Sequence, residues 1–157
     1  MKNKSMAGNK SKGTKPELLV RLLLREAGYG GYRLNWKKAP GKPDICYPGR
    51  KIAIFVNGCF WHRCPNCNPD IPKTNTGFWR AKFDRNVERD GQNMAELKND
   101  GWRVMVVWEC ELSNSLTKIV KFMENAVHGV KPRIMEHDTS IGNVNQKSLK
   151  AKVDENR

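Results

Sequence analysis

The sequence contains no apolar run of membrane length and no hydrophobic region of the kind found in signal peptides. It is also poor in acid, because 16 Asp and Glu residues face 29 Lys and Arg residues, which leaves a formal net charge of +13. The first absence predicts a soluble intracellular protein. The second indicates a polyanionic partner, for which nucleic acid is the leading candidate and an anionic lipid surface the alternative.

No internal repeat is visible, and 157 residues suffice for one domain with an ordinary core but not for two. Residues 1–13 hold four lysines, no acid and almost no large apolar residue, so we expect a flexible basic arm. Residues 14–128 carry the periodic apolar patterns of a folded domain. Residues 129–157 are polar and lysine-rich without periodicity, which predicts a poorly ordered tail.

Start and stop signals near the N-terminus predict a first helix. Thr14 can act as N-cap, Pro16 lies in the first turn, and Glu17 completes a capping box. Leucines at helical spacing give the segment an apolar face, and Gly28 follows its expected end near Ala27. Capping is therefore the structural role that the sequence predicts for Glu17.

Beyond this helix, the patterns predict a sheet flanked by helices. Apolar runs at 44–47 and 51–56 flank a Pro-Gly turn signal and predict a β-hairpin. A helical pattern fills residues 77–100, and the nearly continuous apolar run at 102–109 indicates a strand buried on both faces. A last amphipathic helix is expected at 115–127. This order of elements predicts an α/β fold.

Asp44 lies in the stretch GKPDI, where a loop becomes a strand. One carboxylate at such a position can hold Mg²⁺, with waters and a substrate phosphate completing the shell. An aspartate at the start of a strand can also simply cap a turn, and the short stretch by itself favours neither interpretation. If the hairpin forms, Asn57, the Val56 carbonyl and His62 come within reach of the same cation, and Glu17 could be a further acid.

The cysteines are unevenly spaced: Cys59, Cys64 and Cys67 lie close together, and Cys110 follows the apolar strand. Four thiolates in this arrangement can close a tetrahedral structural zinc site that ties the strand to the loop. The alternative is a set of small buried apolar thiols, which the Pro-Asn turn between Cys64 and Cys67 disfavours. Zinc binding can supply on the order of 10 kcal/mol of folding free energy. Cys46 is expected in the core.

His62 and two aromatic residues lie among these cysteines. His62 could replace one zinc ligand, but four thiolates already satisfy zinc, which frees the imidazole for acid–base chemistry near neutral pH. Phe60 and Trp61 are adjacent and hard to bury together. Beside a basic surface, they and Trp79 could wedge between stacked bases; alternatively, they shield the zinc site from solvent.

The blocks GKPDI, FVNGCFWHRCPNC, KTNTGFWRAKFDRNVERD and GWRVMVVWECEL occur in this order. With them the chain resembles the very short patch repair (Vsr) DNA mismatch endonucleases, from about Lys10 to Leu112. The resemblance implies a restriction-endonuclease-like fold, in which a central mixed sheet carries helices on both sides. It also implies an enzyme that nicks double-stranded DNA beside a T·G mismatch, in the repair of deaminated 5-methylcytosine.

The resemblance further implies roles for individual residues. Asp44 and the Val56 carbonyl correspond to the ligands of a catalytic Mg²⁺, and His62 corresponds to the group that activates the attacking water. Glu17 matches an acid on the first helix, and the basic arm at 1–13 matches one that embraces the duplex. The intercalating aromatics correspond to Phe60, Trp61 and Trp79, and the zinc ligands to Cys59, Cys64, Cys67 and Cys110.

Two positions depart from the pattern of the family. Asn57 stands where well-known members have a second active-site histidine, and an amide can orient a phosphate or a water but cannot transfer a proton at neutral pH. Cys64 occupies a ligand position often held by histidine, which preserves zinc binding and changes only the charge of the site.

Three functions are compatible with these residues. The first is the nicking of T·G-mismatched DNA, and the second is a restriction-type endonuclease that recognises a sequence or a structure. The third is a zinc-stabilised DNA-binding module without catalysis. We expect a monomer in the bacterial cytoplasm, associated with the nucleoid; the sequence does not identify partners from repair or methylation systems.

Overall fold

A computed structural model of the chain describes residues 12–127. Most of the expected basic arm at 1–13 and the whole of the expected tail at 129–157 lie outside the described residues. Within the described part, none of the helices is long and apolar enough to cross a membrane.

The expected first helix is confirmed as α1 (Lys15–Glu26). Thr14 is its N-cap, and the Oγ1 of Thr14 accepts a hydrogen bond from the backbone N–H of Glu17. Beyond the C-terminal end, Gly28 adopts a φ of +82°, a left-handed conformation that glycine reaches without strain. The local signals in the sequence therefore determine both ends of this helix.

The expected hairpin is confirmed as β2 (Ile45–Tyr47) and β3 (Ile52–Asn57), joined by a single 3₁₀ turn, η1 (Pro48–Arg50). The short strand β1 (Arg33–Leu34) extends the sheet beyond β2, and β4 (Arg103–Trp108) lies parallel to β3. The strand order is β1-β2-β3-β4. The described residues thus form a mixed four-stranded sheet with helices, as the α/β prediction requires.

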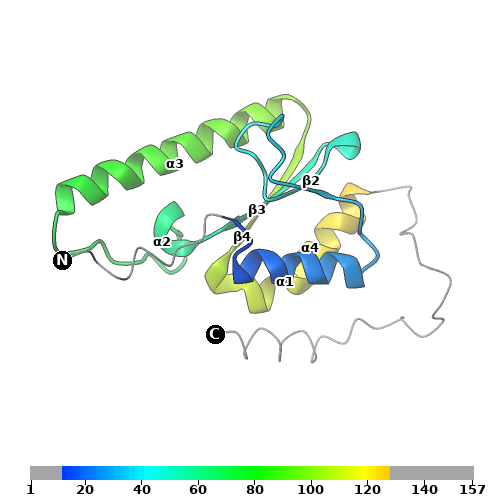
Figure 1. Cartoon of the computed structure of the whole chain (residues 1–157), viewed down its shortest axis with the longest axis horizontal. Helices are drawn as coiled ribbons and strands as arrows, with labels where there is room; N and C mark the ends of the chain where they lie inside the picture. The colour runs from blue at the N-terminus through cyan, green and yellow to red at the C-terminus, as the bar shows by residue number, and fades with distance from the viewer. Residues whose placement is uncertain (1–11, 128–157) are drawn as a thin grey trace.

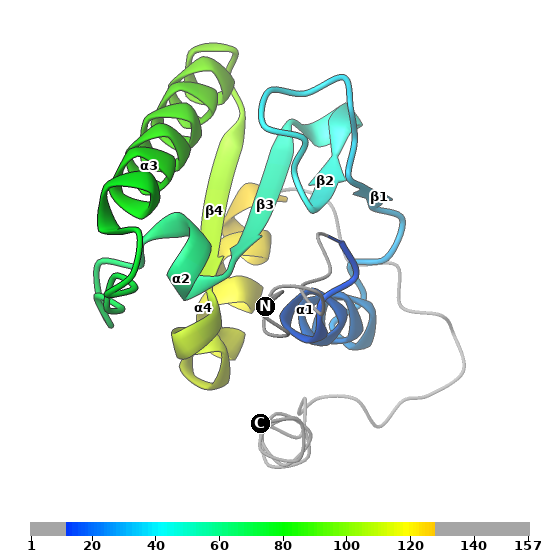
Figure 2. The same cartoon turned by 60° about the vertical axis from the view of Figure 1, so that its left-hand side comes forward.

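The helices cover both faces of the sheet. The long helix α3 (Thr76–Asn99) packs on one face, and α1 and α4 (Leu112–Ala126) pack on the other (Figures 1 and 2). A short helix, α2 (Cys59–His62), follows β3, and a 3₁₀ turn, η2 (Glu109–Glu111), follows β4. Because β3 and β4 are parallel, α2 and η2 lie at the same end of the sheet.

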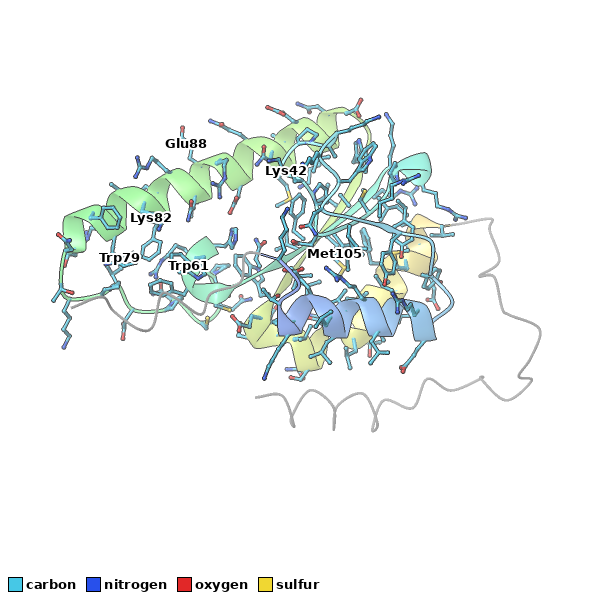
Figure 3. All side chains as sticks on the ribbon, viewed as in Figure 1. Lys42, Trp61, Trp79, Lys82, Glu88 and Met105 are labelled. Carbon is cyan, nitrogen blue, oxygen red and sulfur yellow. The ribbon has the colours of Figure 1, made fainter. Side chains whose placement is uncertain are left out.

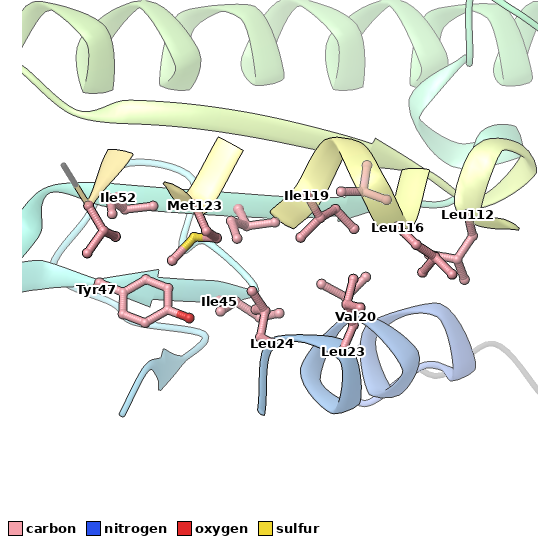
Figure 4. Close-up of a cluster of buried hydrophobic side chains, with 13 residues drawn as sticks. Val20, Leu23, Leu24, Ile45, Tyr47, Ile52, Leu112, Leu116, Ile119 and Met123 are labelled. Carbon is pink, nitrogen blue, oxygen red and sulfur yellow. The ribbon is translucent and has the colours of Figure 1, made fainter. Parts of the chain in front are cut away.

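The larger part of the core lies between the sheet and the pair α1 and α4. Residues of β2 and β3, including Ile45 and Ile52, meet Leu23, Leu24 and Ile119 there (Figure 4). A smaller cluster lies on the α3 face and consists of Ala39, Cys46, Ala53, Leu97 and Trp102. Cys46 is fully buried, which confirms its expected place in the core.

Two local features differ from the sequence-based expectations. The strand β4 is only partly buried: Val107 is 1% exposed, but Arg103 is exposed and the residues between are intermediate. Because β4 is the last strand of the described sheet, no neighbouring strand covers its outer side. The segment at Cys59–His62 forms a helical turn where the sequence suggested a loop.

Candidate functional site

An open cleft of about 1070 Å³ lies at the carboxyl end of β3. Its lining comes from the start of α1, the loop between β1 and β2, the end of β3, and the helices α2 and α3. Seven residues that the sequence singled out line this one cleft: Glu17, Asp44, Val56, Asn57, Phe60, Trp61 and His62. The fold therefore brings together side chains that are up to 45 positions apart in the chain.

Asp44 occupies the open end of the β2–β3 ladder. Its Oδ2 accepts a hydrogen bond of 2.7 Å from the backbone N–H of Val56. The register that pairs Ile45 with Ile54 places Pro43 opposite Val56, and proline has no backbone N–H to donate. The N–H and C=O of one strand residue point to the same side of the strand. Because the Val56 N–H points to Asp44, the Val56 carbonyl also points to that side, where Pro43 has no N–H to donate to it.

The charge of Asp44 is poorly compensated by its surroundings. Burial raises the pKa of this carboxyl from 3.8 to about 6, against the lowering effect of the Val56 hydrogen bond. The negative charge of Glu17 raises the pKa further, whereas His62 and Arg21 lower it. An ionised carboxylate that lacks a full positive counterpart is a suitable binding site for a cation.

Glu17 is 3% exposed and already makes several hydrogen bonds. Its carboxylate accepts from the backbone N–H of Gly13 at 2.8 Å, from the hydroxyl of Thr14 at 3.2 Å and from the guanidinium of Arg21 at 3.1 Å. The capping role expected from the sequence is thus present. The ion pair with Arg21 was not predicted, although the two residues are one helical turn apart.

His62 forms a pair with a residue that sequence reasoning missed. Its Nδ1 lies 2.5 Å from Oδ2 of Asp90, which lies in the middle of α3. Partial burial raises the pKa of Asp90, but the hydrogen bond and charge of His62 outweigh this effect and hold the pKa below its ordinary value. Asp90 is one of several acids on an exposed helix, so no local signal separated it from the others.

Asn57 is the last residue of β3 and is 9% exposed. It lies opposite Trp108 in the parallel ladder and lines the cleft beside Asp44. The position is therefore inside the candidate site, as expected, and it carries an amide that can donate or accept a hydrogen bond.

The four expected cysteines form one cluster. The Sγ atoms of Cys59, Cys64, Cys67 and Cys110 all lie within 4.8 Å of one another, and those of Cys64 and Cys110 are 3.6 Å apart. Four sulfurs bound at about 2.3 Å to one tetrahedral ion would lie about 3.8 Å from each other. The cluster can thus bind a metal such as zinc after only small shifts, and it connects the start of α2 to η2.

The three expected aromatic residues form one cluster with Phe83 beside the cleft. The rings of Phe60 and Trp61 are 5.1 Å apart, Phe60 lies 5.1 Å from the buried Phe83, and Trp79 stacks on Phe83 at 5.7 Å. Lys82 extends over the rings of Trp61 and Trp79, at the N-terminal part of α3 (Figure 3). Phe60 and Trp61 do pack together, because the helical turn of α2 directs both side chains toward α3.

A family model described as DNA mismatch endonuclease Vsr matches residues 1–68. The chain is 46% identical over 105 residues to the type II nicking enzyme V.XorIIP of Xanthomonas oryzae pv. oryzae, an alignment that spans 67% of this chain and 76% of the relative. It is 46% identical over 124 residues to the type II nicking enzyme V.NmeAIP of Neisseria meningitidis, which covers 74% and 87%. It is 36% identical over 111 residues to the DNA mismatch endonuclease Vsr of Escherichia coli, with 71% and 70% covered.

Proposed function

The chain belongs to the family of Vsr DNA mismatch endonucleases, and on this premise we propose that it nicks one strand of duplex DNA beside a T·G mismatch. The observation that carries the proposal is the meeting of Asp44 and His62 in one cleft at the end of β3. We further propose a restriction-endonuclease-like fold for residues 14–128, with the arm at 1–13 and the tail at 129–157 as additional basic segments.

The donor atoms around Asp44 fit a magnesium ion. They are oxygens, which Mg²⁺ prefers: the carboxylate of Asp44 and the carbonyl of Val56, which the register leaves without a ladder donor. The raised pKa of Asp44 indicates a local lack of positive charge that a cation would supply. Bound there, Mg²⁺ would neutralise charge on the phosphate oxygens during hydrolysis.

Other residues of the cleft would activate the water and orient the reacting groups. When Nδ1 of His62 donates its proton to Asp90, Nε2 is left as an acceptor, which is the form that a general base requires. His62 then takes the proton of the water that attacks the phosphorus atom. The bond between phosphorus and the 3′ oxygen breaks, the leaving 3′ oxygen takes a proton from solvent, and the products are a 3′-hydroxyl and a 5′-phosphate. Asn57 would orient the phosphate or the water through its amide.

We expect Asp90→Asn to lower the nicking rate about 10²-fold, the lower range of what a correctly placed general base contributes. An asparagine amide can donate to Nδ1 and so favour the tautomer with the proton on Nε2, which cannot act as a base. The measurement is the single-turnover rate as a function of pH, together with DNA affinity. Asp84→Asn, an exposed position on the same helix, is the matched control.

For Asp90→Asn, the proposal requires an unchanged affinity for DNA and a nicking rate below that of Asp84→Asn at every pH. An equal rate in the Asp90→Asn and Asp84→Asn variants would show that Asp90 does not orient His62.

The cysteine cluster would hold a structural zinc ion. Its four sulfurs fit a tetrahedral site, and its members come from α2, the following loop and η2. The cluster thereby fixes the helical turn that carries Phe60, Trp61 and His62. We propose that Phe60, Trp61 and Trp79 insert beside the mismatch, where stacking on the bases offsets the few kcal/mol of unstacking.

A panel of duplexes tests the proposed function. We expect nicking of a T·G duplex in Mg²⁺ and at least 10²-fold slower nicking of the matched T·A and C·G duplexes, because a mismatched step unstacks more easily. The panel also contains other mismatches in the same sequence context. The readout is the rate of strand cleavage on a denaturing gel, with both strands labelled.

The same panel decides the second candidate function. Several relatives are named type II nicking enzymes, and Asn57 replaces a histidine expected from the family, which together favour an altered target. Equal nicking of matched and mismatched duplexes would assign the protein to restriction-type, sequence-directed cleavage. Intact DNA after long incubation, with salt-dependent binding retained, would indicate a non-catalytic DNA-binding module.

A further inference from the structure

One wall of the cleft has no role in the chemistry described above. It is formed by the loop at residues 37–43, which connects β1 to β2 and leads directly into Asp44. Lys37, Gly41 and Lys42 of this loop line the cleft, and Figure 3 shows Lys42 apart from Trp61. The cleft therefore has one aromatic wall, with Phe60 and Trp61, and one basic wall, with Lys37 and Lys42.

The positive charges of this wall are available to a ligand. Lys37 and Lys42 are both exposed. Among residues 12–127, neither lysine forms an ion pair with a carboxylate, in contrast to Lys51, which pairs with Asp100. Exposed ammonium groups without a protein partner, facing a cleft, favour an anion at that place.

The loop is fixed, although it contains no helix or strand. The N–H of Lys42 donates to the carbonyl of Ala39 at 3.1 Å, and Ala39 is 4% exposed in the smaller core cluster. Gly41, with a φ of +73°, packs so closely that a Cβ there would lie 3.1 Å from Cβ of Asn93 and 3.2 Å from the ring of Phe55. The loop is thus held against α3 and β3, which reduces the entropy lost when a ligand binds.

We propose that the loop at 37–43 binds the backbone phosphates next to the cleaved phosphodiester, with Lys37 and Lys42 as the contacting groups. This inference rests on the proposed function, because the cleaved phosphate is placed at Asp44. Lys42 is two residues from Asp44, and the phosphates of one strand follow each other every 3.4 Å or so along the helix axis. The loop positions the strand backbone, while the aromatic wall engages the bases.

The first test replaces both charges. In an Asp44→Asn background that prevents cleavage, Lys37→Gln with Lys42→Gln should reduce the slope of log affinity against log salt by about 1.8, or about 0.9 per phosphate contact. When NaCl rises from 50 to 200 mM, the parent should then lose affinity by a factor about ten times larger than this variant does. The control is Lys118→Gln with Lys121→Gln, two exposed lysines of α4 on the opposite face of the sheet.

The second test locates the contact on the DNA. A neutral methylphosphonate is placed in turn at each of the two phosphates on either side of the cleavage position. At the contacted phosphate, the substitution should weaken binding of the parent severalfold and leave the affinity of the double lysine variant unchanged. Equal weakening of both proteins at every position, or an unchanged salt slope in the first test, would overturn the proposal.

The third test changes the loop and keeps its charge. Gly41→Ala should weaken DNA binding about as much as the double lysine variant, because the new Cβ displaces the loop from Asn93 and Phe55. Gly31→Ala is the matched control: Gly31 also has a positive φ, of +79°, but nothing lies within 4 Å of its Cβ position. Thermal melting of both variants verifies that they fold, and equal DNA affinity of the two would contradict a role for the loop.

The outcomes separate this inference from the proposed function. If the wild-type protein binds DNA but never nicks it, the proposed function fails, and the salt slope of the double lysine variant still decides whether the loop contacts phosphates. If the wild-type protein nicks T·G duplexes and the double lysine variant matches its Asp44→Asn parent in salt slope and affinity, only the loop assignment fails.

Discussion

Replacing Asp44 with asparagine is expected to lower the rate of strand nicking about 10³-fold or more, because the loss of one negative ligand removes several kcal/mol of metal-assisted stabilisation. The cleft should stay intact, since the Oδ1 of asparagine can still accept the hydrogen bond that the Val56 N–H donates to Asp44. The measurement is single-turnover nicking of a T·G duplex at saturating protein, in parallel with DNA affinity.

The same substitution should stabilise the metal-free protein at neutral pH. In the folded protein the pKa of Asp44 is about 6, whereas an unfolded chain ionises this carboxyl near pH 4. The unfolded chain therefore releases the proton first, and the stability of the wild-type protein falls as the pH rises from about 4 through 6. Above pH 6, Asp44→Asn should be more stable by about 1 to 3 kcal/mol, with no such advantage below pH 4.

These two results together would identify Asp44 as a residue kept for chemistry at the expense of stability. Asp70→Asn, at an exposed acid outside the cleft, is the control and should change neither the nicking rate nor the pH dependence of unfolding. Undiminished nicking by Asp44→Asn would remove the proposed cation site. A stability difference that does not depend on pH would show that burial of the charge is not the cause.

The second large effect is expected at the cysteine cluster. Cys67 is exposed and contributes little packing, yet Cys67→Ala should destabilise the protein strongly, because it removes one of the four proposed metal ligands. Structural zinc can contribute on the order of 10 kcal/mol to folding. The total stability of a domain is of the same size, so partial loss of zinc binding suffices to unfold α2 and the loop that follows it.

Cys46→Ala is the control. Burial alone would predict a larger loss of stability at the buried Cys46 than at the exposed Cys67, whereas the metal site predicts the opposite. Cys46 is fully buried but lies outside the cluster, so its truncation should lower the free energy of unfolding by only about 1 kcal/mol, the usual size for a small core change. The measurements are zinc content per chain and thermal unfolding with and without a chelator. A stable, zinc-free Cys67→Ala variant that is less affected than Cys46→Ala would falsify the metal site.

The cluster also connects stability to function. It fixes the turn of α2, on which Phe60, Trp61 and His62 follow each other directly after Cys59. The backbone N–H of Cys110 donates to the Sγ of Cys59, and this hydrogen bond connects the segment after β4 to α2. Removal of the metal should therefore abolish nicking through the loss of this turn, with the sheet itself the last part to unfold.

Signals between near neighbours in the chain determined much of this protein. Thr14 and Glu17 specify the start of α1, and the apolar runs around η1 specify the hairpin, because capping and strand pairing across a short turn depend on spacing alone. The three cysteines between positions 59 and 67 indicated their cluster for the same reason. The sequence by itself thus determined the α/β class of the fold and most candidate residues of the cleft.

Contacts between distant segments were decided only by the tertiary structure. Asp90 meets His62 because α3 crosses the face of the sheet, and nothing in the pattern of α3 distinguishes it from other exposed acids. The loop at 37–43 faces the cleft because Gly41 packs against Asn93, 52 positions later. The physical reason is that side-chain spacing fixes only local geometry, whereas the neighbours of a cleft depend on how whole elements pack.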